Sequence, residues 1–150
     1  MIGVGAVKYA DLSQNRVSNY VFSFDRMLSL KGNTAPYLQY AYARMRSILR
    51  EAGDWQRVPP ALDDPAELNL AKALVALGDA VVRVADDDEP NHLCSQLYEI
   101  AQAFSRFYEA CPVLRSEEPV RTSRLVLCDA TATGLREGLA LLGIDVLERL

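Results

Sequence analysis

Tyrosines and arginines gathered in residues 37–50 are the part of this sequence best suited to chemistry. Tyrosine rings and guanidinium planes stack on unpaired nucleobases, and arginine also forms forked hydrogen bonds with phosphate. The group comprises Tyr37, Tyr40, Tyr42, Arg44, Arg46 and Arg50, which recur three or four residues apart along two rows. The pattern favours a nucleic-acid surface. The alternatives are a solvated face for the arginines and, for the tyrosines, packing against residues 1–30.

Residues that could carry out catalysis are nearly absent. The single histidine, His92, stands at a helix start with no nucleophile patterned around it. The acidic run 86–89 fits a solvated helix end rather than a pair of carboxylates on an apolar face. Gly3 and Gly5 do not continue into a phosphate-binding loop. We therefore expect this chain to catalyse no reaction by itself.

The cysteines and the apolar stretches indicate the compartment. Cys94, Cys111 and Cys128 are odd in number and include no CxxC pair. This favours reduced, buried thiols over a disulfide or a zinc site. No apolar stretch approaches the roughly 18 residues of a membrane-spanning helix, and no charged-then-apolar leader opens the chain. The expectation is a cytoplasmic protein.

Composition and charge describe a globular protein with an uneven charge distribution. The chain has 150 residues, 50% hydrophobic and 24% charged, which excludes collagen-like, disordered and membrane classes. Its formal net charge is -4, yet residues 1–57 carry eight Lys/Arg against four Asp/Glu, whereas residues 58–99 carry two against nine. A nucleic-acid surface in the arginine-rich first third is therefore compatible with an acidic protein.

Four apolar stripes with steps of three and four residues predict the elements that position these residues. They predict helices over about residues 35–52, 66–86, 93–111 and 119–142. The second is either one helix or two joined near Gly78 and Asp79. Four or five amphipathic helices with short connections predict an all-α helical bundle.

The first 32 residues have a different character. Residues 1–14 are apolar on too many sides for a free terminus. The segment 20–25 alternates β-branched and aromatic residues with polar ones, which predicts a short strand. A lone strand cannot satisfy its own backbone. We expect a short helix and a strand that packed against sequence missing from this chain.

Blocks along the whole chain resemble the C-terminal region of arginyl-tRNA synthetases. The blocks are residues 5–13, 33–44, 104–109, 124–128 and 141–150, of which the second and the last are the most specific. Residues 33–150 are similar to the DALR-type anticodon-binding domain, an all-α bundle. Residues 1–32 resemble the end of the class I catalytic domain and its junction with that bundle.

The resemblance implies an arginine–tRNA ligase by origin, which uses ATP with magnesium, arginine and tRNA. The HIGH-like and KMSKS-like motifs with which class I synthetases hold ATP have no counterpart here, so no cofactor is expected in the fragment. The implied partners are the anticodon stem-loop of arginine tRNA and the missing catalytic domain, with no membrane and no DNA.

The resemblance also implies site residues. Tyr108 matches an aromatic position that meets an anticodon base in the family, with core packing as the alternative. Arg149 and Leu150 resemble another family contact, at which leucine replaces an expected methionine. The expected tRNA surface comprises Tyr37, Tyr40, Arg44, Arg46, Arg50, Tyr108, Arg121, Arg124, Arg149 and Leu150.

Two of these arginine pairs have stated roles or alternatives. Arg46 and Arg50 are expected to contact phosphate. Arg121 and Arg124 would place charge beside Tyr108, although Arg124 could equally pair with Glu117 or Glu118. The alternative function is a helical protein-interaction or dimerisation module that binds no RNA and associates through the apolar residues 2–12.

Overall fold

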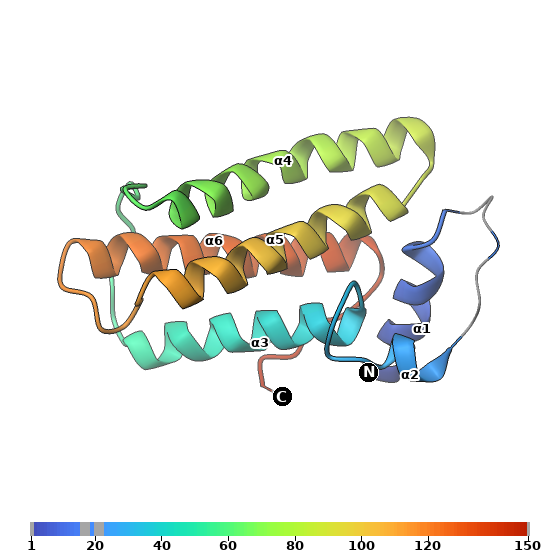
Figure 1. Ribbon diagram of the computed structural model, residues 1–150, viewed down its shortest axis with the longest axis horizontal. Coiled ribbons are helices and arrows are strands. Elements are labelled where there is room, and N and C mark those ends of the chain that lie inside the picture. The colour runs from blue at the N-terminus through green and yellow to red at the C-terminus, as the bar shows by residue number, and fades with distance from the viewer. Residues whose placement is uncertain (1, 16–18, 20–22, 150) are drawn as a thin grey trace.

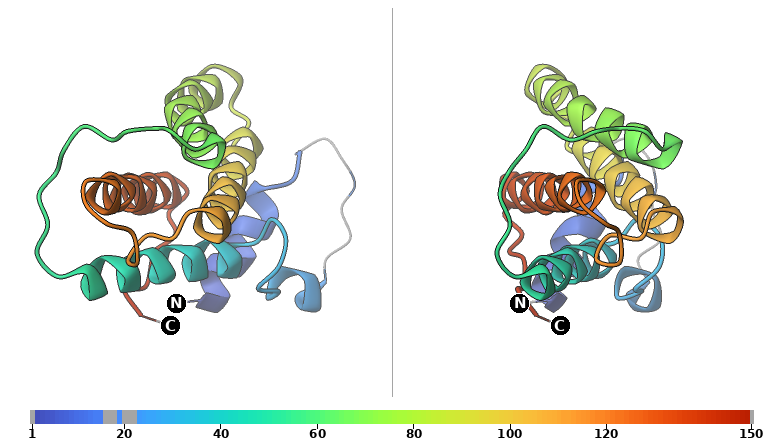
Figure 2. Two further views of the ribbon diagram at one scale, coloured as in Figure 1. Left: turned by 60° about the vertical axis from the view of Figure 1, so that its left-hand side comes forward. Right: turned by 90° about the vertical axis from the view of Figure 1, so that its left-hand side faces the viewer.

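The computed structural model describes residues 2–15, 19 and 23–149, and within them the fold is entirely helical. The helices are α1 (Ile2–Leu12), α2 (Phe24–Met27), α3 (Ala35–Ala52), α4 (Pro65–Asp87), α5 (Asn91–Ala110) and α6 (Val120–Leu141). Helices α3 to α6 run side by side, and α1 lies across one end of them (Figure 1). Seen from the end, α3 forms one tier, α5 and α6 the next, and α4 the outermost (Figure 2). The expected all-α bundle is confirmed. None of the helices in the described part of the chain is long and apolar enough to cross a membrane.

Helix α3, which carries most of the candidate surface, begins and ends at the residues expected from the sequence. The Thr34 side chain caps the helix by accepting a hydrogen bond from the backbone N–H of Tyr37. Pro36 fits in the first turn because a proline there needs no N–H. Gly53 has a positive φ of 70°, which a side chain would disfavour, so the helix stops at Ala52.

Helix α4 is continuous, which decides between the two alternatives left by the sequence. Asp64 and Glu67 form a capping box that satisfies the first backbone N–H groups. The helix passes through Gly78 and Asp79 and ends at Asp87, and its C-cap residue Asp88 has a positive φ of 55°.

The apolar stripes form the core that was expected from their spacing. Every stripe position on α5 and α6 is buried, namely Leu93, Leu97, Ile100, Phe104, Phe107 and Cys111, then Leu125, Cys128, Ala132, Leu135, Leu139 and Leu142. On α4 only Leu70 is fully buried, because this helix forms the outer tier and its stripe contacts the core from one side.

Helices α5 and α6 approach closely at one glycine. A Cβ built on Gly138 would lie 2.4 Å from Cδ2 of Leu97, a side chain with no exposed surface. The two helices can therefore pack at this separation only because residue 138 has no side chain.

The predicted strand at residues 20–25 is wrong where the structure describes it. Ser23 is the N-cap of α2, and Phe24 and Asp25 lie inside that helix. The turn satisfies its backbone locally, since Met27 N–H donates to Ser23 and Leu28 N–H donates to Phe24. Residues 20–22 lie outside the described residues.

Helix α1 is the expected short helix, and it packs directly on the bundle. Its buried residues are Gly5, Ala6 and Tyr9. The Tyr9 hydroxyl lies 2.6 Å from Oδ1 of Asn33 and 2.9 Å from the carbonyl oxygen of Cys94. Burial raises the pKa of Tyr9 above its ordinary value. This side chain therefore fastens α1 to both α5 and the loop before α3.

Replacing Tyr9 with phenylalanine is expected to lower the free energy of unfolding by about 1–2 kcal/mol. The ring would stay in place while the Cys94 carbonyl lost a buried donor. Urea unfolding followed by circular dichroism measures the change. The control is Tyr40→Phe, because Tyr40 is 46% exposed and its loss of a hydroxyl should change stability by less than about 0.5 kcal/mol. Equal values for the two variants would contradict the anchoring role.

Candidate nucleic-acid interface

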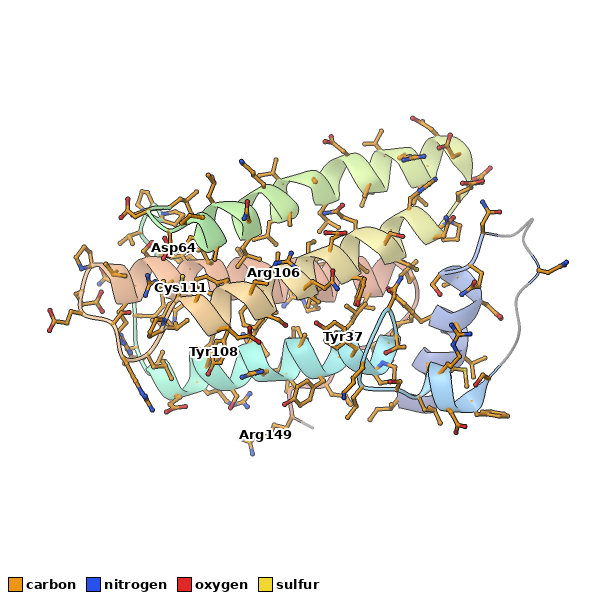
Figure 3. The ribbon with its side chains drawn as sticks, viewed as in Figure 1. Tyr37, Asp64, Arg106, Tyr108, Cys111 and Arg149 are labelled. Carbon is orange, nitrogen blue, oxygen red and sulfur yellow. The ribbon has the colours of Figure 1, made fainter. Side chains whose placement is uncertain are left out.

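Tyr108 and Arg44, predicted from separate parts of the sequence, lie together in the structure. The Tyr108 ring is half-buried near the end of α5, between α5 and α3 (Figure 3). Its centroid lies 6.0 Å from that of the Phe104 ring, with the two planes 29° apart. Arg44 Cζ, from α3, lies 4.3 Å from the Tyr108 centroid. Tyr108 is therefore packed on the core and is also part of a cation–π pair.

Arg44 also lines a shallow hollow that collects positive charge. The hollow has a volume of about 330 Å³ and is lined by Tyr40, Ala43, Arg44, Ser47, Arg50 and Arg149. Among the described residues, no carboxylate forms an ion pair with Arg44 or Arg149. A concave site with unpaired guanidinium groups beside an aromatic ring attracts an anionic, aromatic ligand.

Arg46 and Arg50, expected to contact phosphate, instead hold a carboxylate of their own chain. Glu148 accepts hydrogen bonds from the Tyr42 hydroxyl at 2.6 Å and from Arg46 Nε at 2.9 Å. Arg50 Nη1 donates to the backbone carbonyl of Glu148 at 3.0 Å and lies 3.9 Å from its carboxylate. The hydrogen bonds from Tyr42 and Arg46 lower the pKa of Glu148.

Acidification is expected to release Glu148 from these partners. Because its pKa in the folded protein lies below the ordinary value of 4.5, the interaction is complete above that value and is lost as the pH falls through the lowered pKa. The groups facing its carboxylate are Tyr42, Arg46 and Arg50. A carboxyl NMR titration should give a lower midpoint for Glu148 than for the same residue in the Arg46→Ala variant. Equal midpoints would contradict the assignment.

The two tyrosines predicted beside this surface lie in different places. Tyr37 packs against α5, with its ring edge-on to that of Tyr98 at 5.7 Å and its hydroxyl 3.4 Å from Oγ of Ser105. Tyr40 is exposed at the hollow. Leu150, the last predicted site residue, lies outside the described residues.

Arg121 and Arg124 are held by the fold at the start of α6. Arg121 Nη2 donates to the carbonyl of Ala52 at 2.8 Å, where it caps the C-terminal end of α3. It also forms an ion pair with Glu118 at 3.4 Å. Its charge is thus directed at the end of α3 and at Glu118.

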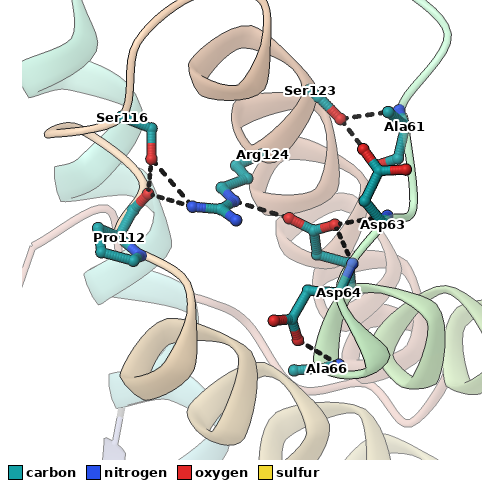
Figure 4. A network of polar contacts seen from close by, with 9 residues as sticks. Ala61, Asp63, Asp64, Ala66, Pro112, Ser116, Ser123 and Arg124 are labelled. Carbon is teal, nitrogen blue, oxygen red and sulfur yellow. Dashed lines mark hydrogen bonds and ion pairs between the residues drawn. The ribbon is translucent and has the colours of Figure 1, made fainter.

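Arg124 pairs with Glu67, and not with Glu117 or Glu118. Its Nε donates to Glu67 at 2.7 Å, and its Nη1 donates to the carbonyl of Pro112 and to Ser116 Oγ, both at 2.9 Å (Figure 4). The side chains of Arg124 and Glu67 are only 15% and 4% exposed. These three hydrogen bonds hold the Arg124 guanidinium group inside the fold.

The sequence analysis missed Glu67 and Glu148, the two carboxylates that organise these arginines. Glu67 was detectable as a helix-capping residue, since it follows Asp64 by three positions before an apolar run. Glu148 had only an indirect signal, the row of Tyr42, Arg46 and Arg50 on one helix face. Its partners lie about a hundred residues away, so no local pattern could pair them.

The cysteines are buried and free, as the sequence suggested. Burial raises the pKa of the Cys94 and Cys128 thiols to about 12. Thiols with such values carry almost no thiolate at neutral pH and are poor nucleophiles. They pack as small apolar side chains in the core.

Comparison with known proteins identifies the class to which this fold and surface belong. The family described as the DALR anticodon binding domain matches residues 38–150, and the chain belongs to that family. Its relatives include the arginine–tRNA ligases of Synechococcus sp. and Synechocystis sp., which are 58% and 56% identical over 99% of this chain. The resemblance to arginyl-tRNA synthetases is thereby confirmed.

Solved structures agree with the sequence comparison. The arginyl-tRNA synthetase of Thermus thermophilus superimposes over the whole chain with a TM-score of 0.94 and 34% identity. That of Plasmodium falciparum superimposes over 99% of the chain with a TM-score of 0.88 and 34% identity. This chain spans 27% of each of these two structures and 26% of the Synechococcus ligase, or about a quarter of their length.

Proposed function

We propose that this chain is the part of an arginine–tRNA ligase that binds the anticodon stem-loop of arginine tRNA. The observation that carries the proposal is the Arg44–Tyr108 pair at the edge of an arginine-lined hollow. Anticodon bases are single-stranded and can be splayed onto aromatic or guanidinium planes. All arginine codons have guanine in the middle, so all arginine anticodons have cytosine there. That shared base is the one we assign to the pair.

In this proposal the aromatic stack and the adjoining hollow have different roles in tRNA binding. Phe104, Tyr108 and Arg44 form a stack from the core outward, and an unpaired base extends this stack on the exposed side of the guanidinium group. Arg149 in the adjoining hollow, which forms no ion pair among the described residues, attracts the phosphates that flank the base. Stacking contributes base contacts and the hollow contributes salt-dependent affinity.

We assign the chemistry of the parent ligase to sequence outside this chain. The HIGH-like and KMSKS-like motifs that hold ATP are absent from residues 1–150. ATP, magnesium and arginine would bind in the catalytic domain of a cytoplasmic enzyme, and this chain would contribute tRNA binding alone. We also propose the division into residues 1–32, the junction, and residues 33–150, the anticodon-binding bundle.

Several apolar side chains in residues 1–32 are exposed, which supports the presence of another protein surface that covers them in a complete ligase. They are Ile2, Val4, Val7, Phe24, Leu28 and Leu30, each at least 37% exposed. We propose that the catalytic domain covers them in a complete ligase. In its absence the same residues favour the second candidate function, association between copies of this chain. Light scattering that shows a dimer, with no tRNA binding by that dimer, would support this second candidate.

The test of the proposed function is a titration with arginine tRNA and with the same tRNA carrying a changed middle anticodon base. The unchanged tRNA is expected to bind more tightly. Tyr108→Ala should reduce that preference by about 1–3 kcal/mol, which is the typical contribution of one stacked base. Tyr108→Leu, which keeps an apolar side chain in the core but has no π-face, should show the same loss.

Salt dependence separates this proposal from general electrostatic attraction. Equal binding of the two tRNAs, falling steeply with salt, would mean that only the phosphate backbone is recognised. That result would contradict base reading by this chain. A pair of variants tests the role of charge in the same titration. Arg44→Ala and Arg83→Ala each remove one positive charge, and Arg83 is the control because it lies on α4, far from the hollow in sequence.

A further inference from the structure

Residues 143–149 follow α6 and run along α3, to which side chains tie them at several points. Lys8 Nζ donates to the carbonyl of Gly143 at 2.7 Å, and Gln39 Nε2 donates to that of Asp145 at 2.7 Å. Ile144 between them is buried. The segment is therefore held by side chains from both α1 and α3 before it reaches Glu148.

Glu148 makes the strongest of these attachments, although its charge is unfavourable for binding an anion. Its carboxylate accepts from Tyr42 and Arg46, and its backbone carbonyl accepts from Arg50. A carboxylate here neutralises guanidinium charge beside the hollow and repels phosphate. Electrostatic attraction of RNA therefore gives no reason for an acidic residue at this position.

The next residue along the chain supplies a geometric reason. Arg149 lines the hollow together with Tyr40 and Arg44, and it projects beyond α3 (Figure 3). An arginine on a free chain end would lose side-chain and backbone entropy on binding. Anchoring residue 148 removes the backbone part of that cost, because it fixes the backbone from which Arg149 extends.

We propose that Glu148 is a positioning residue for tRNA binding: it anchors residues 143–149 to α3 so that Arg149 stands beside Arg44 at the hollow. The inference rests on the proposed function and adds to it the residue that orients one side of the surface. It also reassigns Arg46 from phosphate contact to anchoring.

The test compares Glu148→Ala with Glu137→Ala, an exposed glutamate on α6 that pairs with Arg136. Each variant removes one negative charge, so a purely electrostatic role predicts slightly tighter binding of every tRNA and no change in the preference between them. The positioning role predicts that only Glu148→Ala loses preference for the unchanged anticodon, by roughly tenfold, as expected for the loss of a charge-assisted hydrogen bond. Glu148→Gln keeps the shape of the side chain and an acceptor oxygen. Its preference for the unchanged anticodon should therefore lie between those of Glu148→Ala and Glu137→Ala.

A second measurement needs no RNA. NMR order parameters of the backbone of residues 145–149 are expected to fall in Glu148→Ala and to stay unchanged in Glu137→Ala. Unchanged order parameters in Glu148→Ala would overturn the anchoring. Lower order parameters with an unchanged preference between the tRNAs would overturn the link from anchoring to recognition. A parent chain that shows no preference between the tRNAs would instead overturn the proposed function, together with the part of the inference that depends on it.

Discussion

Glu67→Ala is expected to lower the free energy of unfolding by about 3–5 kcal/mol, the usual effect of breaking a buried ion pair from one side. One oxygen of this carboxylate accepts from Arg124 at 2.7 Å, and the other accepts from the backbone N–H groups of Asp63 and Asp64 at 3.0 Å. Alanine would leave a guanidinium group only 15% exposed without its carboxylate, and two helix-capping N–H groups without an acceptor.

Urea unfolding measures this loss, with Glu137→Ala as the exposed control that should change stability by less than about 0.5 kcal/mol. A loss below about 1 kcal/mol for Glu67→Ala would mean that the network is replaced by water. Converting both Glu67 and Arg124 to methionine should recover much of the loss, because a packed apolar pair carries no desolvated charge.

Gly138→Val is expected to cost about 3 kcal/mol, at the upper end for overpacking a core. Its Cβ would lie 2.4 Å from Cδ2 of Leu97 and 3.2 Å from Cγ and Cδ1 of the same side chain. Leu97 is fully buried and has nowhere to move without displacing α5. The helices would have to separate, which opens packing along their whole contact.

The control is Gly78→Val on α4, where no atom lies within 4 Å of an added Cβ. Stability there should change by less than about 0.5 kcal/mol, since valine and glycine have similar helix propensities. Combining Gly138→Val with Leu97→Ala should cost less than the sum of the two single changes, because the smaller side chain makes room for the new one. An additive double variant would contradict the contact.

The sequence was most informative where structure depends on neighbours along the chain. The stripes on α3, α5 and α6 identified the buried faces because a helix repeats its contacts every three to four residues. Thr34, Pro36 and Gly53 gave the bounds of α3 since capping is a local interaction. These features established the bundle before any contact between helices was known.

Prediction failed where a residue's partner lies far away or where one local signal competes with another. Glu117 and Glu118 were the possible partners of Arg124 that the sequence predicted. Arg124 instead pairs with Glu67, which lies 57 positions earlier on another helix. At residues 23–25 the aromatic alternation favoured a strand, yet the Ser23 side chain caps a helical turn that needs no pairing strand. Within the candidate surface, Tyr108 and Arg44 were each identified, but their contact was not.

The contacts of α1 have a mechanical consequence. Lys8 holds the turn at Gly143, while a Cβ on Gly5 would come within 3.1 Å of Ile144 Cγ2, so α1 and that turn mesh with almost no clearance. Any displacement of α1 would therefore have to displace this turn as well, or break the Lys8 hydrogen bond and the close packing of Gly5 against Ile144. The position of the C-terminal segment is in this way coupled to that of the first helix.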